Sequence, residues 1–478
     1  MTRRSVSKAS AWLAVSRVIT SAFGYVYWVI VARLAGEAVV GAASAALGIA
    51  VILQLVGTLG VHRGAQGLFA EAIGREDMET ARAVLGSTLT LAVLVCPVLC
   101  LGTYALARAQ GFDGTISALV GAMAWLGSLA FYFRGLIAGS LKTTPVALAS
   151  LAAGTTRVAV GAGLVYAGFK TAGAVGGYVA AWAVYSSVEL WALRTYGIRP
   201  TFNPGLLRKI LALGLPQWIA AVLMAAGNRI GVIYLYSAVS DVQAGAFFAS
   251  LTAMLVLDSL SASAMNLIYP ALKSGSDVSK AERVIRVATA LSSVVASTAA
   301  VYGWLVLLPL GRYYVENAHL LSIIALGFPL ADLSIAVSSV AYAMEDLRIV
   351  ALSGLLLNGV RVVGFMALIP RMGALGGALA YLAGSLAGSA ITPLLRIRYG
   401  IPLDRTVRAL SLPWIAPAVC WLARVPWYAG VPLSLVVSLV LLLRLGALDR
   451  EEIESVLRGM GLPDSLTSPL RGILAALG

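Results

Sequence analysis

Long apolar runs, separated by short polar or glycine-containing steps, make up nearly all of this 478-residue chain. A helix needs about 20 apolar residues to cross the hydrocarbon core of a bilayer. On that measure the pattern predicts about fourteen transmembrane helices. The predicted helices of the first half cover residues 11–32, 36–60, 84–106, 116–139, 146–168 and 172–193. Those of the second half cover 210–236, 242–266, 287–310, 319–342, 349–369 and 373–393, followed by a pair at 410–423 and 428–443.

The two halves of the chain repeat one another at an offset of 204 residues. Residues 239–249 (VSDVQAGAFFA) fall on residues 35–45 (AGEAVVGAASA). The matched positions include Gly41 with Gly245, Glu37 with Asp241, Gln54 with Asp258, and Arg157 with Arg361. Such a repeat is typical of membrane transporters that are built from two homologous bundles. We therefore predict an all-α integral membrane protein of two pseudo-symmetric six-helix bundles and two further C-terminal helices.

This repeat divides the chain into four predicted parts. Residues 1–198 form the first bundle, 199–393 a linker and the second bundle, 394–447 the two extra helices, and 448–478 a cytoplasmic tail. The tail opens with the helix-start sequence Asp-Arg-Glu-Glu at 449–452. Its apolar residues that share one helix face are Ile453, Val456, Leu457 and Met460. This face indicates either a helix on the membrane surface or a solvated tail helix. Residues 62–83 are a second predicted charged helical connector.

The composition fits a bilayer environment, because 60% of the residues are hydrophobic and only 12% are charged. The net charge of +14 would suggest nucleic acid as a partner of a soluble protein. Here the basic residues gather in alternate loops, where about 24 of the 35 lie on one side and about 6 on the other. That asymmetry predicts a multi-pass protein of the cell membrane with both termini cytoplasmic and no nucleic-acid partner. The basic N-terminus resembles a signal peptide, but the apolar run after it is long enough for a retained first helix.

Several function classes are disfavoured by what the chain lacks. No phosphate-binding Gly-x-x-x-x-Gly-Lys-Ser/Thr loop is present, so we do not expect ATP-driven pumping by this chain alone. The predicted outer loops are too short to hold a glycosyl-transfer site, so no enzyme is expected. The three cysteines, Cys96, Cys100 and Cys420, lie in apolar runs without acidic or histidine neighbours, which indicates neither a metal site nor disulfides.

Five arginines lie inside predicted transmembrane helices, where each costs roughly 2.5–3.5 kcal/mol at a helix centre. They are Arg17, Arg134, Arg157, Arg229 and Arg361. Arg17 and Arg134 lie near a cytoplasmic boundary, where their side chains could instead reach the headgroups. The other three are deeper, which favours a hydrated cationic cavity between the bundles. Because guanidinium groups bind phosphate through two hydrogen bonds, we expect these arginines to bind an anionic substrate.

Three acidic residues also lie inside predicted helices: Glu189, Asp258 and Asp332. They could form buried ion pairs with the arginines. Alternatively, one of them could bind a coupling cation, either H⁺ or Na⁺. No other cofactor is expected.

Several motifs resemble those of polysaccharide-biosynthesis flippases. Residues 32–41 (ARLAGEAVVG) follow a first helix that contains Ser16 and Arg17. Residues 70–77 (AEAIGRED), 213–216 (LGLP) and 368–378 (LIPRMGALGGA) also match, in the same order. The resemblance spans nearly the whole chain. The flippases that it resembles belong to a superfamily that also contains the MATE multidrug exporters and the peptidoglycan-precursor flippases.

The resemblance implies a V-shaped pair of six-helix bundles with a cationic cavity. It also implies movement of lipid-linked oligosaccharides, attached through phosphate or pyrophosphate, from the cytoplasmic to the outer leaflet by alternating access. One position departs from the family pattern, because Gly231 replaces an aspartate that many relatives carry in the seventh helix. That difference weakens any role of this helix in cation coupling.

Three other functions remain open. A MATE-like exporter of small organic cations would need acidic residues without excess arginine. A membrane glycosyltransferase or polymerase would need larger outer loops. A structural protein would not need deep arginines in both repeats. The partners expected for a flippase are its lipid-linked substrate, membrane lipids and enzymes of glycan assembly. The protein itself is expected to be a monomer.

Overall fold

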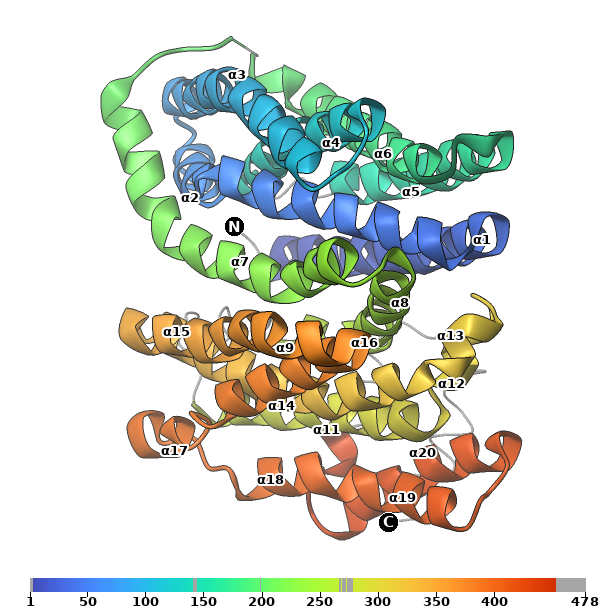
Figure 1. Ribbon diagram of the computed structural model, residues 1–478. Helices are drawn as coiled ribbons and strands as arrows, with labels where there is room; N and C mark the ends of the chain where they lie inside the picture. The colour runs from blue at the N-terminus through green and yellow to red at the C-terminus, as the bar shows by residue number, and fades with distance from the viewer. Residues whose placement is uncertain are drawn as a thin grey trace. The chain divides into compact units, whose positions relative to one another are not determined.

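The computed structural model describes residues 3–140, 144–197, 199–265 and 278–452, with two single residues at 268 and 272. Helices and their short connections make up this part of the chain, and it contains no strand (Figure 1). Nine of the described helical stretches are long and apolar enough to cross a membrane. The predicted class, an all-α membrane protein, is confirmed.

The helices occur in the following order along the chain. The first are α1 (Arg3–Thr58), α2 (Val61–Gly74), α3 (Met78–Ala109), α4 (Gly114–Gly139), α5 (Thr144–Leu164), η1 (Val165–Phe169), α6 (Lys170–Leu193), η2 (Arg194–Tyr196) and α7 (Pro204–Ala238). They are followed by α8 (Asp241–Leu257), α9 (Ser259–Met265), α11 (Val278–Tyr302), α12 (Trp304–Leu307), α13 (Arg312–Glu316), α14 (Ala318–Ala343), α15 (Leu347–Gly354) and η3 (Leu355–Gly359). The last are α16 (Val360–Ser389), α17 (Leu394–Tyr399), α18 (Asp404–Ser411), η4 (Leu412–Trp414), α19 (Ile415–Leu422) and α20 (Trp427–Arg444).

Three of the nine apolar stretches each contain two predicted helices, joined across a glycine. The breaks are at Gly36 (φ 80°), Gly168 (φ 93°) and Gly373 (φ 57°). Positive φ is unfavourable for residues that carry a Cβ, so glycine lets the chain change direction there without a loop. Two other predicted helices fall on α8 and α19, which have 17 and 8 residues. The total of fourteen transmembrane helices depends on these two short helices and therefore stays a prediction.

Local capping explains why several helices begin where they do. The Asp77 carboxylate accepts from the Thr80 N–H at 2.9 Å at the start of α3, and Asp113 accepts from the Ile116 N–H at 2.9 Å at the start of α4. Hydrogen bonding to Thr80 also lowers the pKa of Asp77. Each aspartate satisfies a backbone donor that the first helical turn leaves without a carbonyl partner.

The described helices form two compact units, each considered by itself. Unit 1 comprises Met1–Thr252, Leu308–Tyr314 and Val362–Ala380, and unit 2 comprises Ala253–Leu307, Val315–Arg361 and Tyr381–Gly478. In unit 1, α1 packs against α4, α5, α6 and α7, while α2 packs against α3, α4 and α7. In unit 2, α11 packs against α9, α14, α18 and α20. The four predicted parts, with boundaries at 198, 393 and 447, stay predictions.

A reciprocal contact in unit 1 joins the two matched glycines of the repeat. A Cβ added at Gly41 of α1 would lie 1.7 Å from the carbonyl oxygen of Asp241, and one added at Gly245 of α8 would lie 2.6 Å from that of Glu37. The two helices therefore approach backbone to backbone, each through its own copy of the same motif. Small residues permit such approaches in membrane helices.

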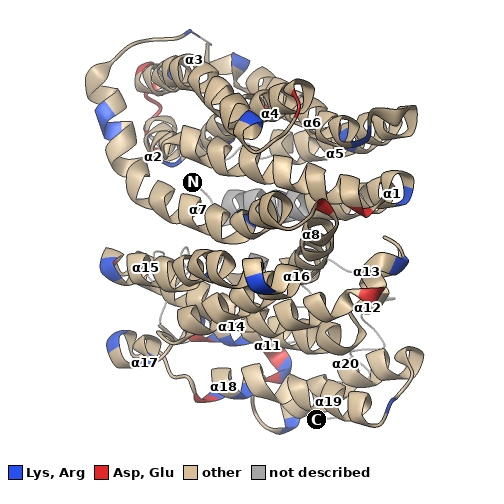
Figure 2. Ribbon diagram, in the orientation of Figure 1, with Lys and Arg blue, Asp and Glu red and all other residues tan. Residues whose placement is uncertain are grey.

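The predicted connector at 62–83 is helical, but it is divided into α2 and the first turn of α3. One face of helix α2 is buried, because Val61, Ala65 and Phe69 lie in a core with residues of α3 and α4. Charge does gather at helix ends and turns elsewhere, and long stretches of the helices carry few charged residues (Figure 2).

Ion pairs in unit 2 fix the start of the tail. Arg405 donates to both oxygens of Asp449 at 2.9 and 3.1 Å, which lowers the pKa of Asp449. Glu452 pairs with Arg286 and Arg283 of α11 and accepts from the Asp449 N–H at 3.0 Å. The predicted helix start at Asp449 is therefore present. The tail residues Ile453, Val456, Leu457 and Met460 lie outside the described residues, so the amphipathic face stays a prediction.

Candidate functional site

Arg157 is held in the interior of unit 1. It lies on α5, only 8% of its surface is exposed, and its Nη2 donates to the carbonyl oxygen of Thr20 at 3.3 Å. Its guanidinium carbon lies 4.9 Å from the ring centre of Tyr178 and 5.7 Å from that of Tyr27. Its Nε is buried without a hydrogen-bond partner among the described residues. A buried guanidinium with an unused donor is prepared for an additional acceptor.

Two further aromatic side chains, Trp28 and Phe248, link the tyrosines beside Arg157 to Arg229. Trp28 Nε1 donates to the Tyr178 hydroxyl at 3.1 Å, and the Trp28 ring lies 4.8 Å from that of Phe248. The guanidinium of Arg229, on α7, lies 6.0 Å from the Phe248 ring centre and within electrostatic range of Tyr178. We call Tyr27, Trp28, Arg157, Tyr178, Arg229 and Phe248 the aromatic–arginine cluster.

The cluster carries positive charge that the described part of the chain does not neutralise. No carboxylate among those residues forms an ion pair with Arg157 or Arg229. The ring faces stabilise the guanidinium groups by cation–π attraction, about 0.5–2 kcal/mol each depending on desolvation. An aromatic ring, unlike a carboxylate, does not occupy the guanidinium hydrogen bonds. The arrangement therefore stabilises the arginines and leaves them able to bind an anion.

Arg361 has a similar environment in unit 2. It is 2% exposed, its guanidinium carbon lies 3.8 Å from the Tyr381 ring centre, and its Nη2 donates to the Ser385 hydroxyl at 2.9 Å. Arg157 precedes the glycine break at Gly168 by eleven residues, and Arg361 precedes the break at Gly373 by twelve. In both units a deep arginine thus packs on a tyrosine of the helix after the break.

The acidic pair of unit 2 is hydrogen-bonded to serines. Asp258 accepts from the Ser292 hydroxyl at 2.7 Å, and Asp332 accepts from the Ser261 hydroxyl at 2.7 Å. Both aspartates are 3% exposed. Tyr381 lies within electrostatic range of both. Among the described residues neither aspartate forms an ion pair with an arginine, in contrast to the pairing considered from the sequence.

Arg134, on α4, and Glu189, on α6, form an ion pair in unit 1. Arg134 Nε lies 2.9 Å from Glu189 Oε1, and the Glu189 side chain is fully buried. The Arg134 guanidinium also lies 4.9 Å from the Tyr185 ring centre. Because Glu189 compensates its charge, Arg134 attracts an anion less strongly than Arg157 does. Arg17 lies on α1, and its side chain falls outside the described residues.

The tyrosines and serines around the charged residues were not predicted. Tyr178 directly follows the glycine pair 176–177, and Tyr381 follows the matching pair 376–377 by four residues. An aromatic residue shortly after each copy of the glycine motif was the available signal. The sequence analysis did not recognise this signal, because a tyrosine among apolar residues of a helix is ordinarily interpreted as a core residue.

The profile of the family described as "Polysaccharide biosynthesis protein" matches residues 6–276, which confirms the resemblance read from the sequence motifs. No curated protein matches the chain.

Solved structures of similar fold cover most of the chain. One is described as the lipid II flippase MurJ in an inward closed conformation, with a TM-score of 0.72, 13% identity, and coverage of 89% of this chain and 96% of that chain. Another is an inward-facing multidrug resistance MATE family transporter of the MOP superfamily, with a TM-score of 0.63, 16% identity, and coverage of 82% and 98%. An outward-facing structure of such a transporter has a TM-score of 0.59, 15% identity, and coverage of 82% and 96%. At these identities the similarity shows the fold.

Proposed function

We propose a function from the premise that this chain belongs to the polysaccharide biosynthesis protein family. The protein translocates oligosaccharides linked to a lipid through phosphate or pyrophosphate, from the cytoplasmic to the outer leaflet, by alternating access. A saccharide cannot cross hydrocarbon unaided, because its hydroxyl groups would lose their hydrogen bonds to water. The protein supplies a polar path for the headgroup while the lipid tail remains in the bilayer.

The observation that supports this proposal most directly is the uncompensated charge of the aromatic–arginine cluster. Arg157 and Arg229 bind the substrate phosphate in unit 1, and Arg361 offers a similar site in unit 2. A phosphate placed beside buried guanidinium groups offsets part of the cost of burying them. Within unit 1, a site that selects organic cations would instead present an unpaired carboxylate, and the Glu189 carboxylate is already neutralised by Arg134.

The acidic pair of unit 2 is our candidate for energy coupling. Asp258 and Asp332 are buried and hydrogen-bonded to serine hydroxyls rather than to arginines. Each can take up a proton or contribute oxygen ligands to Na⁺. Uptake of H⁺ or Na⁺ there from the outer side, where the substrate is released, and its discharge to the cytoplasm would drive the cycle in one direction.

Transport by the purified protein tests the proposed function. Proteoliposomes that contain the protein should move a fluorescent lipid-diphosphate oligosaccharide between leaflets, as detected by a membrane-impermeant quencher. Empty liposomes are the control. Uptake of ethidium, an organic cation, is measured in the same vesicles. Ethidium transport without movement of the lipid-linked oligosaccharide would replace the flippase proposal with the cation-exporter alternative.

Both termini are proposed to be cytoplasmic, in the cell membrane, as the basic-residue asymmetry predicts. In a variant without native cysteines, single cysteines at Gly111 and Pro370 should react with an impermeant maleimide added to whole cells. A cysteine at Gly67, on α2, should react only after the cells are opened. Labelling of the Gly67 position from outside would reverse the assigned orientation. A monomeric state and contacts with glycan-assembly enzymes belong to the same proposal.

A further inference from the structure

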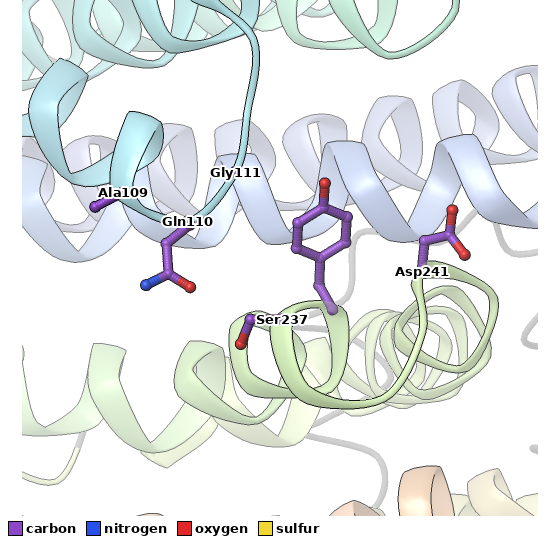
Figure 3. Close-up of a pocket in the computed structure, with 6 residues that line it drawn as sticks. Ala109, Gln110, Gly111, Ser237 and Asp241 are labelled. Atoms are coloured by element: carbon purple, nitrogen blue, oxygen red, sulfur yellow. The ribbon is translucent and has the colours of Figure 1, made fainter.

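A polar pocket in unit 1 lies apart from the aromatic–arginine cluster. It has a volume of about 670 Å³ and is lined by Ala109, Gln110, Gly111, Tyr236, Ser237 and Asp241. Figure 3 shows that Gln110 comes from the turn after α3, Ser237 from the end of α7 and Asp241 from the start of α8. Volumes of about 300–1,000 Å³ are usual for small-molecule sites.

We propose that this pocket is a saccharide subsite on the outer face, which binds one sugar unit of the translocated headgroup. The proposal rests on the proposed function, because it takes its ligand class from the flippase substrate. Both turns that line the pocket, near 107–115 and 237–241, are outer loops in the predicted topology. The subsite would hold the oligosaccharide as it leaves the membrane.

The turn after α3 is fixed by hydrogen bonds of its own. The Phe112 N–H donates to the Ala107 carbonyl at 3.2 Å, and Arg108 Nη1 donates to the Phe112 carbonyl at 2.7 Å. Phe112 is 2% exposed, so the turn is anchored in the unit interior. Gln110 is therefore presented from a preformed turn, which lowers the entropy lost when a ligand binds.

A ring stack ties this turn to α7. The Phe112 and Tyr236 rings are parallel within 1°, with ring centres 4.7 Å apart. This offset stacking is a favoured aromatic geometry. The stack holds the Tyr236 ring of α7 against the turn after α3, so the phenol keeps a defined place in the pocket lining.

The lining groups suit sugar hydroxyls better than a phosphate. The Gln110 amide donates and accepts, the Ser237 and Tyr236 hydroxyls do both, and the Asp241 carboxylate only accepts. One oxygen of Asp241 accepts from the Val242 N–H at 2.8 Å, and the carboxylate still has further acceptor sites. No basic side chain is among the six lining residues, and Asp241 would repel an anion. A neutral or amino sugar offers the mixed donors and acceptors that this set can satisfy.

Saturation-transfer NMR tests the proposal on the full-length protein in lipid nanodiscs. The probe is the repeat oligosaccharide released by mild acid from the host's own surface glycan, free of lipid and phosphate. We expect saturation transfer to its ring protons with the wild-type protein. In the double variant Gln110→Ala/Asp241→Asn we expect binding to weaken about ten-fold, the loss expected for one or two hydrogen bonds.

Glu37→Gln provides the matched control. The repeat places Glu37 at the position equivalent to Asp241, yet Glu37 does not line the pocket. This variant should bind the oligosaccharide as the wild type does. Equal binding by the wild type and the double variant, or no binding by the wild type, would overturn the saccharide subsite.

The outcome is separable from the proposed function. The transport assay with the wild-type protein decides whether lipid-linked oligosaccharide is moved at all. If the wild type transports the substrate but the double variant binds the oligosaccharide as well as the wild type does, the subsite proposal is refuted and the flippase proposal is not. Failure of wild-type transport refutes the flippase proposal, whatever the NMR result.

Discussion

Replacing Arg157 with alanine is expected to abolish headgroup translocation while the protein still inserts and folds. Its guanidinium is buried beside Tyr27 and Tyr178 and has a donor that no described group uses. Removing one partner of a buried, hydrogen-bonded charge pair costs about 2–5 kcal/mol of binding. Substrate phosphate should therefore bind at least about 30-fold more weakly. Folding should survive, since the substitution removes a costly buried charge from the membrane interior.

The proteoliposome flipping assay and surface-glycan export in cells both measure this effect. Arg157→Lys should be only partly active, because lysine keeps the charge but loses the planar pair of donors and the ring stacking. Arg75→Ala is the matched control, since Arg75 forms an exposed ion pair with Glu71 on α2. Exposed pairs of this kind contribute little to stability. Arg75→Ala should therefore flip substrate at the wild-type rate.

Combining the Arg157 substitution with one at Arg361, the equivalent arginine of unit 2, tests whether the two arginines bind phosphate. Arg361 packs on Tyr381 as Arg157 packs on Tyr178, so the double variant Arg157→Ala/Arg361→Ala removes both copies of the arrangement. We expect no export from this variant at normal expression. Normal export would show that the two arginines serve structure, and the phosphate-binding proposal would then be withdrawn.

Replacing Gly41 with alanine is expected to have the largest effect on stability. The added methyl group would lie 1.7 Å from the Asp241 carbonyl oxygen, which is far inside van der Waals contact. The obstacle is backbone, so no side-chain rotation can relieve it, and α1 and α8 must separate. Overpacking of a core typically costs about 1–3 kcal/mol and occasionally more. We expect the upper end of that range or beyond.

Thermal unfolding in detergent, followed by the loss of the monodisperse peak in size-exclusion chromatography, measures this cost. Gly67→Ala on α2 is the control, because a Cβ there meets no atom within 4 Å. Alanine is favoured over glycine in a helix by about 1 kcal/mol, so the control should be neutral or slightly stabilising. An unchanged melting temperature for Gly41→Ala would mean that the two helices do not approach as closely as described.

The sequence by itself determined the class of protein and the order of its helices. In a bilayer every backbone polar group must be satisfied within the protein, so apolar length alone identifies a spanning helix. The sequence match of Gly41 with Gly245 also corresponds to a feature of the structure. Both glycines lie at the same helix crossing, where neither could carry a side chain. Predicted boundaries at residues 36, 168 and 373 coincide with glycine breaks, because positive φ leaves glycine as the favoured residue.

Only the tertiary structure decided what each buried charge contacts. The sequence predicted that Arg134 and Arg157 both lie within transmembrane helices, yet one is neutralised by Glu189 and the other packs on Tyr27 and Tyr178. Asp258 and Asp332 likewise bind serines from helices far away in the chain. The cost of burying a charge is set by the few groups within about 4–6 Å. In a repeat of apolar helices, the rotation and packing of each helix determine those neighbours. The hydropathy of the sequence does not specify either.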